Sequence, residues 1–163
     1  VWDSCDSAAW DKLYKVKLFK GRRYPFGVLH EDLNFTSKLF SESDKIVLTG
    51  MPLYNYLIRE NSICNKPFTT QKFDIYEQAK LNCQFVRDTY KELEEKAKYF
   101  LFRCTCTLLQ SASDAAQISE KDLKRVKELA RTQLSTAILN RFVPLGERKY
   151  YFELLYKVCI KKK

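Results

Sequence analysis

The chain has 163 residues, a hydrophobic fraction of 45% and a net charge of +9, with only 4 glycines and 4 prolines. This composition suits one domain, or a small domain with a helical extension, and it excludes a disordered chain or a loop-rich β-sandwich. No run of about 18 apolar residues is present, so no membrane-spanning helix is predicted. Residues 1–6 lack the features of a signal peptide and do not begin with methionine, as expected of an excised or processed piece.

The charge of the chain limits its partners. Its 29 Lys and Arg residues are interleaved with 20 Asp and Glu residues. They form none of the motifs of zinc fingers, RNA-binding domains or arginine-rich segments, so we predict no nucleic-acid partner. Two interpretations stay open: a solvated, mildly basic surface, and peripheral contact with an anionic membrane.

The cysteines indicate the redox compartment. Six cysteines are scattered along the chain, and the one close pair, Cys104 and Cys106, lacks the spacing of zinc ligands. The chain also has a single histidine, so we predict no metal site and free, mostly buried thiols. Reduced thiols favour a cytoplasmic protein, and its basic surface allows a peripheral position at the inner face of the cell membrane.

The first third of the chain has both helix and strand signals. Residues 8–20 are predicted to form a short helix that Gly21 ends, and a second helix is predicted to begin near Asp32. Residues 45–49 and 53–59 are rich in β-branched and aromatic residues and flank Gly50-Met51-Pro52, which predicts two strands.

The pattern changes near Pro67. Apolar residues recur every three or four positions from residue 76 to 100, which is a heptad-like seam for packing within the chain or for oligomerisation. Ser119 to Asp122 has the pattern of a capping box that begins another helix. We predict two long antiparallel helices joined by a small-residue loop at residues 111–117.

The last segment follows a helix break at Pro144-Leu145-Gly146. Residues 148–163 are basic at both ends and apolar nearly all round. This segment either docks on the helical hairpin or lies in a membrane interface, and both alternatives stay open. The predicted fold class is therefore α+β, with an α/β segment in residues 1–66 and a mainly helical region in residues 67–163.

Two adjacent acids follow the turn that contains Pro25 and Gly27. Glu31 and Asp32 lie where a helix is predicted to begin. A carboxylate there can face a cleft and act as a general base, and the helix dipole favours its anionic form. The same pair is also an ordinary helix cap, so these two residues alone do not establish a catalytic site.

Four blocks of sequence occur in order and at close spacing between residues 8 and 63. They are Trp10-Asp11-Lys12-Leu13-Tyr14, then Tyr24-Pro25-Phe26-Gly27 followed by Glu31-Asp32, then Lys45-Ile46-Val47-Leu48-Thr49, and Pro52-Leu53-Tyr54-Asn55-Tyr56 followed by Arg59 and Ser62. Together they resemble the later part of the catalytic domain of bacterial family 2 glycosyltransferases, which have the GT-A fold.

The resemblance implies a fold and a reaction. Residues 1–66 would be the C-terminal part of a GT-A catalytic domain, and residues 67–163 a helical C-terminal extension. The enzyme would move a sugar from a nucleotide-sugar to a hydroxyl of a cell-surface polysaccharide or lipid-linked glycan, with inversion. Asp32 would be the catalytic base, Glu31 would shape the acceptor side, and Arg59 and Ser62 would lie near the donor diphosphate.

The resemblance also implies further substrate contacts in the Trp10-Asp11-Lys12 block. Trp10 either stacks on a sugar ring or fills the core. Asp11 stands where the family pattern has asparagine, so it keeps a hydrogen-bond acceptor but adds a negative charge near Asp32. His30 either touches the acceptor or is a variable loop residue.

The family pattern also requires an upstream half with an Asp-x-Asp element that holds Mg²⁺ or Mn²⁺ on the diphosphate. This chain has no such element. We therefore expect the metal ligands to lie outside it and the isolated chain to be inactive. Two strands without sheet neighbours would leave an edge that pairs with a second copy. The alternative function is a non-catalytic helical interaction module, in which Glu31 and Asp32 only cap a helix.

Overall fold

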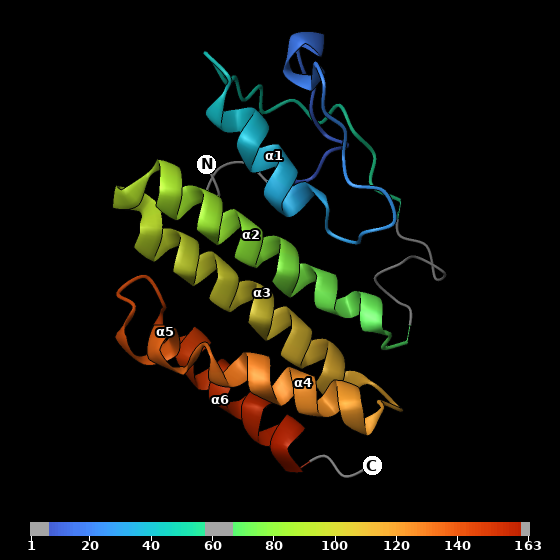
Figure 1. Ribbon diagram of the computed structural model, residues 1–163, viewed down its shortest axis with the longest axis vertical. Helices are drawn as coiled ribbons and strands as arrows, with labels where there is room; N and C mark the ends of the chain where they lie inside the picture. Colours follow the sequence, from blue (N-terminus) through green and yellow to red (C-terminus); the bar gives the residue numbers. More distant parts are fainter. Residues whose placement is uncertain (1–6, 58–66, 161–163) are drawn as a thin grey trace. The chain divides into compact units, whose positions relative to one another are not determined.

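The structure is a computed structural model that describes residues 7–57 and 67–160 (Figure 1). The chain divides into two compact units, Val1–Lys66 and Pro67–Lys163. In its described residues, the first unit contains the short 3₁₀ helix η1 (Val16–Phe19) and the helix α1 (Asp32–Ser41). The described helices that follow in the sequence belong to the second unit.

Residues 45–57 overturn the predicted fold class. They form an irregular coil, and no strand occurs in residues 7–57 or 67–160. The prediction of strands at 45–49 and 53–59, and of an α+β fold, is therefore wrong, with residues 58 and 59 outside the described range. A strand needs backbone hydrogen bonds to a neighbour, and β-propensity alone does not supply one. The described residues thus offer no sheet edge on which a second copy could pair.

The predicted helix at residues 8–20 is also wrong. Only η1 is helical there, and extended backbone at Lys15 and Lys20 bounds it. A short helix is stable only when an apolar face packs against the rest of the protein. Leu13 and Val16 are instead exposed, so nothing stabilises a longer helix at this position.

An aromatic cluster holds the first unit together. The Phe19 ring lies 5.5 Å from Tyr14, 6.1 Å from Tyr24 and 6.0 Å from Phe35, between ring centroids. Tyr24 and Phe35 are 4.4 Å apart, and the Tyr24 hydroxyl lies 3.2 Å from the buried Thr36 hydroxyl. The cluster therefore fixes η1 and the turn after it against α1, which begins at Asp32 as predicted.

α3 (Glu94–Asp114) is the central helix of the second unit. It contacts four further helices: α2 (Asp74–Thr89), α4 (Glu120–Arg131), α5 (Leu134–Leu139) and α6 (Leu145–Ile160). Two 3₁₀ helices, η3 (Thr70–Phe73) and η4 (Lys91–Leu93), precede α2 and α3. Figure 1 shows α2 and α3 running side by side. Phe102 of α3 is fully buried and packs on Tyr151 of α6 with ring centroids 5.2 Å apart.

The heptad-like seam at residues 76–100 forms two helices rather than one. α2 ends at Thr89, and Tyr90 leaves the helical conformation while its N–H donates to the Val86 carbonyl at 2.7 Å. Ala79 and Val86 of α2 and Ala97 of α3 are buried, and the two helices contact each other. The periodicity therefore serves packing within the chain.

The predicted capping box is confirmed. α4 begins at Glu120, and the Ser119 hydroxyl accepts a hydrogen bond from the Asp122 N–H at 3.1 Å. The loop before it is shorter than predicted, because α3 continues to Asp114. α3 and α4 are joined by this loop and contact each other.

α6 docks on the second unit through one face. Tyr151, Leu154 and Val158 are fully buried, and the helix contacts α3 and α4. Docking is thus the alternative that the structure supports for residues 145–160. The opposite face leaves Phe152 and Tyr156 exposed. None of the described helices has the length and hydropathy needed to cross a membrane.

Burial differs among the cysteines of the second unit, in which Cys83 of α2 is half-buried. Cys104 and Cys106 are buried in α3, and burial raises the pKa of each thiol to about 12. Cys159 on α6 is exposed, and all four cysteines in the described residues are free thiols. Cys5 and Cys64 lie outside the described residues.

These pKa values predict selective labelling at pH 8. Iodoacetamide should modify Cys159 readily and Cys104 and Cys106 at least about a hundredfold more slowly, because a buried thiol with a raised pKa forms little thiolate. Mass spectrometry of the digested protein measures each site. Comparable labelling of all three in the folded protein would contradict the structure.

The same thiols predict a pH dependence of stability. Above about pH 8.5 the unfolded chain releases these protons while the folded chain retains them, so the free energy of unfolding should fall as pH rises. The Cys104→Ala/Cys106→Ala variant should show a shallower fall between about pH 8.5 and 9.5. Urea titrations of both proteins give the comparison.

Candidate functional site

Glu31 and Asp32 stand at the beginning of α1. Glu31 occupies the N-cap position but has helical dihedral angles and makes no capping hydrogen bond through its side chain. Asp32 is the first helical residue and is half-buried. The interpretation of the pair as an ordinary helix cap is therefore incomplete, because the Glu31 side chain makes no hydrogen bond to the N–H groups at the start of α1. Asp32 still lies where the helix dipole favours a negative charge.

His30 directs the chain into this helix. Its φ of 58° is in the left-handed region, which a residue with a side chain rarely adopts. The His30 carbonyl accepts a hydrogen bond from the Leu33 N–H at 3.1 Å. The side chain is exposed. Backbone strain of this kind often occurs at functional sites. It also occurs in tight turns, and His30 lies in the turn that leads into α1.

Trp10 joins two blocks that are far apart in the sequence. Its ring centroid lies 4.4 Å from that of Tyr54 and 5.3 Å from that of Tyr56. Trp10 remains 47% exposed, so this aromatic stack is a surface feature and not a buried core. An exposed aromatic stack is a suitable platform for a sugar ring or another planar group.

Asp11 and Lys12 form an ion pair with each other. The Lys12 ammonium donates to the Asp11 carboxylate and to the Ala8 carbonyl, the latter at 2.7 Å. Lys12 therefore balances the negative charge that Asp11 adds where the family pattern has asparagine. The carboxylate oxygens of Asp11 still provide hydrogen-bond acceptors.

The structure describes neither the remaining predicted site residues nor a set of ligands for the implied metal. Arg59 and Ser62 lie outside the described residues. Within residues 7–57 and 67–160, no group of three or more His, Cys, Asp or Glu residues is placed to hold a metal ion. The described donor set therefore does not fit Mg²⁺ or Mn²⁺, and we derive no step through a metal.

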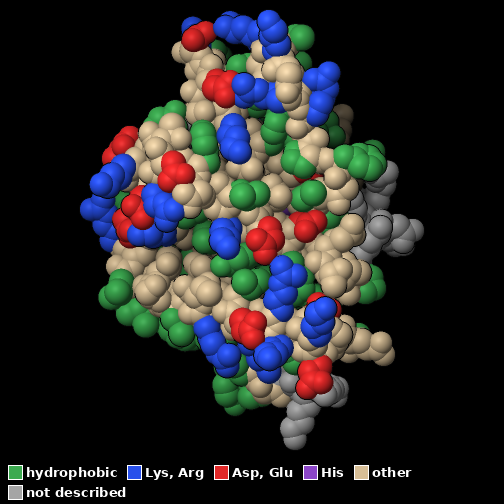
Figure 2. Space-filling view, viewed as in Figure 1, with side chains coloured by type: hydrophobic (Ala, Val, Ile, Leu, Met, Phe, Trp, Pro, Cys, Tyr) green, Lys and Arg blue, Asp and Glu red, His purple; other side chains and the backbone are tan. Residues whose placement is uncertain are grey.

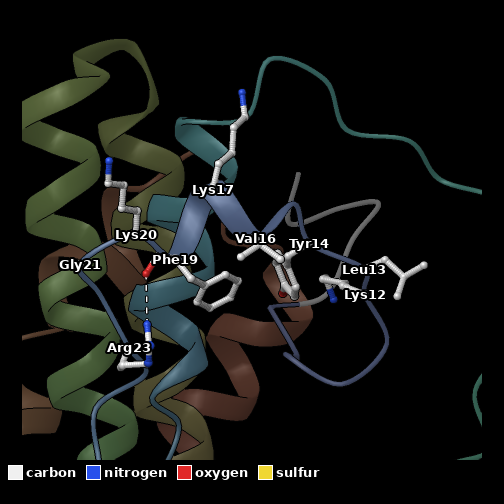
Figure 3. Close-up of a pocket in the computed structure, with 9 residues that line it drawn as sticks. All are labelled: Lys12, Leu13, Tyr14, Val16, Lys17, Phe19, Lys20, Gly21 and Arg23. Carbon is white, nitrogen blue, oxygen red and sulfur yellow. Dashed lines mark hydrogen bonds between the residues drawn. The ribbon is translucent and has the colours of Figure 1, made fainter.

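The first unit contains a hollow of about 770 Å³, and Lys12 is one of the residues that line it (Figure 3). The aromatic rings of Tyr14 and Phe19 line it together with basic residues, namely Lys12, Lys17, Lys20 and Arg23. Arg23 donates to the Phe19 carbonyl at 3.2 Å, which holds its guanidinium at the hollow. This mixture of positive charge and aromatic surface suits an anion that carries an apolar part.

Tyr14 is the most perturbed group of the hollow. Its hydroxyl is buried near Tyr24 and Thr36, without a hydrogen bond of ordinary geometry. Burial, reinforced by Tyr24, raises the pKa of Tyr14 well above its usual value. The phenol therefore stays neutral at physiological pH and adds no negative charge to the basic hollow.

Sequence reasoning missed this hollow because it assigned residues 8–20 to a helix. The available signal was the density of basic residues from Lys12 to Arg23, which are not matched by acidic residues in that segment. Elsewhere the charges mix: Figure 2 shows Lys and Arg interspersed with Asp and Glu over the face in view.

Part of the chain is related to a glycosyltransferase. It is 39% identical over 56 residues to Glycosyltransferase GlyA of Streptococcus pneumoniae serotype 4 (strain ATCC BAA-334 / TIGR4). The matched stretch is 34% of this chain and spans only 8% of the length of that relative. The chain matches no protein-family profile and no solved structure. A glycosyltransferase-related region is thus shown, and a specific family is not.

The aromatic cluster predicts a local effect of Phe19→Ala. Loss of three ring contacts should lower the stability of the first unit by about 2 kcal/mol. Trp2 and Trp10 both belong to this unit, so tryptophan fluorescence during urea unfolding reports on it. Phe26→Ala is the matched control, because Phe26 is fully exposed. Equal effects of the two substitutions would contradict the cluster's role.

Proposed function

We propose that this chain supplies part of the active site of an inverting family 2 glycosyltransferase, with Asp32 as the catalytic base. The observation that carries the proposal is the 39% identity over 56 residues to a protein named as a glycosyltransferase. The four blocks of sequence described above lie within residues 8–63. The contacts of Trp10 with Tyr54 and Tyr56 support the view that these blocks act as one site.

The reaction that we propose is a single displacement at the anomeric carbon of a nucleotide-sugar. The acceptor oxygen forms a bond to that carbon, and the bond from the carbon to the diphosphate oxygen breaks. The acceptor proton passes to the Asp32 carboxylate, and the nucleoside diphosphate leaves with the bonding electrons. Attack from the opposite face inverts the configuration.

The position of Asp32 suits this task for a physical reason. A general base must be anionic before the reaction, and the N-terminus of α1 favours the anionic form. Glu31 precedes it and makes no capping bond through its side chain, which leaves its carboxylate available to shape the acceptor side. The donor sugar, the acceptor and the linkage are not assigned.

The other residues have supporting roles in this proposal. Trp10 stacks on a sugar ring, and Asp11 accepts a hydrogen bond from a sugar hydroxyl while Lys12 balances its charge. His30 contacts the acceptor from the turn before α1. Arg59 and Ser62 bind near the donor diphosphate, because an arginine fork can bond two phosphate oxygens.

We further propose that the isolated chain does not transfer sugar. Its matched region spans 8% of the relative's length. The described residues also hold no donor set for the metal that the family uses on the diphosphate. The nucleotide-binding and metal-binding groups are then supplied by a larger protein.

A helical interaction module is the second candidate function. The second unit is built only from helices in its described residues, and the outer face of α6 exposes Phe152 and Tyr156. In that case Glu31 and Asp32 have a structural role at the start of α1. The two functions predict different effects of removing the Asp32 charge: loss of sugar transfer for the enzyme, and loss of stability for the interaction module.

Asp32→Asn in the complete protein should lower kcat for sugar transfer at least about a hundredfold, because a general base contributes about 10²–10⁴-fold. Circular dichroism and the unfolding midpoint should change little, because a charge at a helix N-terminus contributes about 0.3–1 kcal/mol. Radiolabelled sugar incorporation measures the rate.

Asp44→Asn is the control for this test. Asp44 is exposed and pairs only at 3.3 Å with the exposed Lys17, so its neutral variant should transfer sugar normally. If Asp32→Asn kept a third or more of the activity, Asp32 would not be the base. If it lost activity and stability together, the structural role would be favoured.

A further inference from the structure

The loop from Lys12 to Arg23 combines positive charge with exposed apolar side chains, and of these residues the proposed sugar transfer uses only Lys12. It contains six basic residues and no acidic residue. Leu13 and Val16 lie within it and are 104% and 86% exposed. Figure 3 shows Leu13 extending away from the rings of Tyr14 and Phe19. The loop therefore presents aliphatic groups in the middle of a basic segment.

Much of this positive charge is not balanced. Three of the six basic residues have a carboxylate partner: Lys12 pairs with Asp11, Lys17 with Asp44 at 3.3 Å, and Arg22 with Glu42 at 2.6 Å. Lys15 and Lys20 have no partner among the described residues. Arg23 donates only to the carbonyls of Phe19 and Arg22 among these residues, which leaves its charge without a counter-ion.

We propose that this loop binds the surface of an anionic phospholipid bilayer. Headgroup phosphates bind in the hollow beside Lys17, Lys20 and Arg23, whose ammonium and guanidinium groups donate to phosphate oxygens. Leu13 and Val16 insert at the boundary of the acyl chains. The proposal is independent of the sugar-transfer reaction, since it uses neither Asp32 nor Glu31.

The exposed aliphatic residues favour a lipid over a soluble phosphate compound. Leu13 and Val16 border the hollow and are almost fully exposed, so a nucleotide bound against the cations and the rings of Tyr14 and Phe19 would cover little of their apolar surface. A bilayer removes both from water and places the cations at the headgroups, which is how basic amphipathic segments bind membranes. A second copy of the loop is disfavoured because the charges would repel.

Vesicle flotation of the full chain tests the proposal. The protein should float with phosphatidylcholine vesicles that contain about 30 mol % phosphatidylglycerol, and not with pure phosphatidylcholine, because the attraction needs an anionic surface. Binding should weaken as salt rises. No flotation with the anionic vesicles would overturn the proposal.

Two loop variants localise the binding. Lys15→Gln/Lys20→Gln should weaken it about thirtyfold, because each basic residue at an anionic surface contributes on the order of 1 kcal/mol. Leu13→Ser/Val16→Ser should weaken it at least about tenfold at unchanged charge. All four residues are exposed, so these variants should fold, and circular dichroism checks that they do.

Matched controls decide whether the loop is responsible. Lys80→Gln/Lys121→Gln removes the same charge from exposed positions of the second unit and should bind normally. If this variant lost as much vesicle binding as Lys15→Gln/Lys20→Gln, net charge alone would explain the binding and the proposal would be overturned. Phe152→Ser/Tyr156→Ser tests the exposed face of α6, and loss of vesicle binding in this variant without loss in the loop variants would also overturn the proposal.

Uridine diphosphate should not release the protein from vesicles, and release would assign the hollow to a nucleotide instead.

Discussion

The first unit depends on the contacts of a single ring, that of Phe19. Tyr14, Tyr24 and Phe35 all lie against it, and they come from the segment before η1, the turn after it and α1. Without a sheet in the described residues, aromatic packing is the main interaction that can fix these segments together. The start of α1 at Asp32 and the basic loop are therefore parts of one aromatic-centred arrangement.

That arrangement separates two kinds of chemistry. Carboxylates lie at the start of α1, where the helix dipole favours negative charge, while positive charge and the exposed Leu13 and Val16 lie on the loop. Asp11, which follows Trp10, forms an ion pair with Lys12, the first residue of the loop. An enzyme that glycosylates a lipid-linked acceptor would need both a carboxylate base and a contact with lipid, so the two proposals are compatible while remaining separable.

Local signals predicted the helices better than the rest of the fold. The capping box at Ser119 and the start of α1 follow from short-range hydrogen bonding and helix electrostatics, which a few residues determine. The strands at 45–49 and 53–59 failed because a strand depends on a partner elsewhere in the chain. The seam at 76–100 predicted burial only in part, since Ala79, Val86 and Ala97 are buried but Leu93 is exposed. Its periodicity continues across Tyr90, where the chain turns, so it could not reveal the break between α2 and α3. For the candidate site, the sequence pointed to Trp10, Asp11 and Lys12, but it could reveal neither their stacking and ion pairing nor the hollow beside Phe19.

The position of Asp32 relative to the acceptor is the central claim of this account. A crystal structure of the complete protein with a nucleoside diphosphate and an acceptor glycan tests it most directly. The account predicts an Asp32 carboxylate oxygen within about 2.6–3.2 Å of the acceptor hydroxyl, on the face opposite the diphosphate. An acceptor hydroxyl bound to a different base, with Asp32 engaged only at the end of α1, would contradict it.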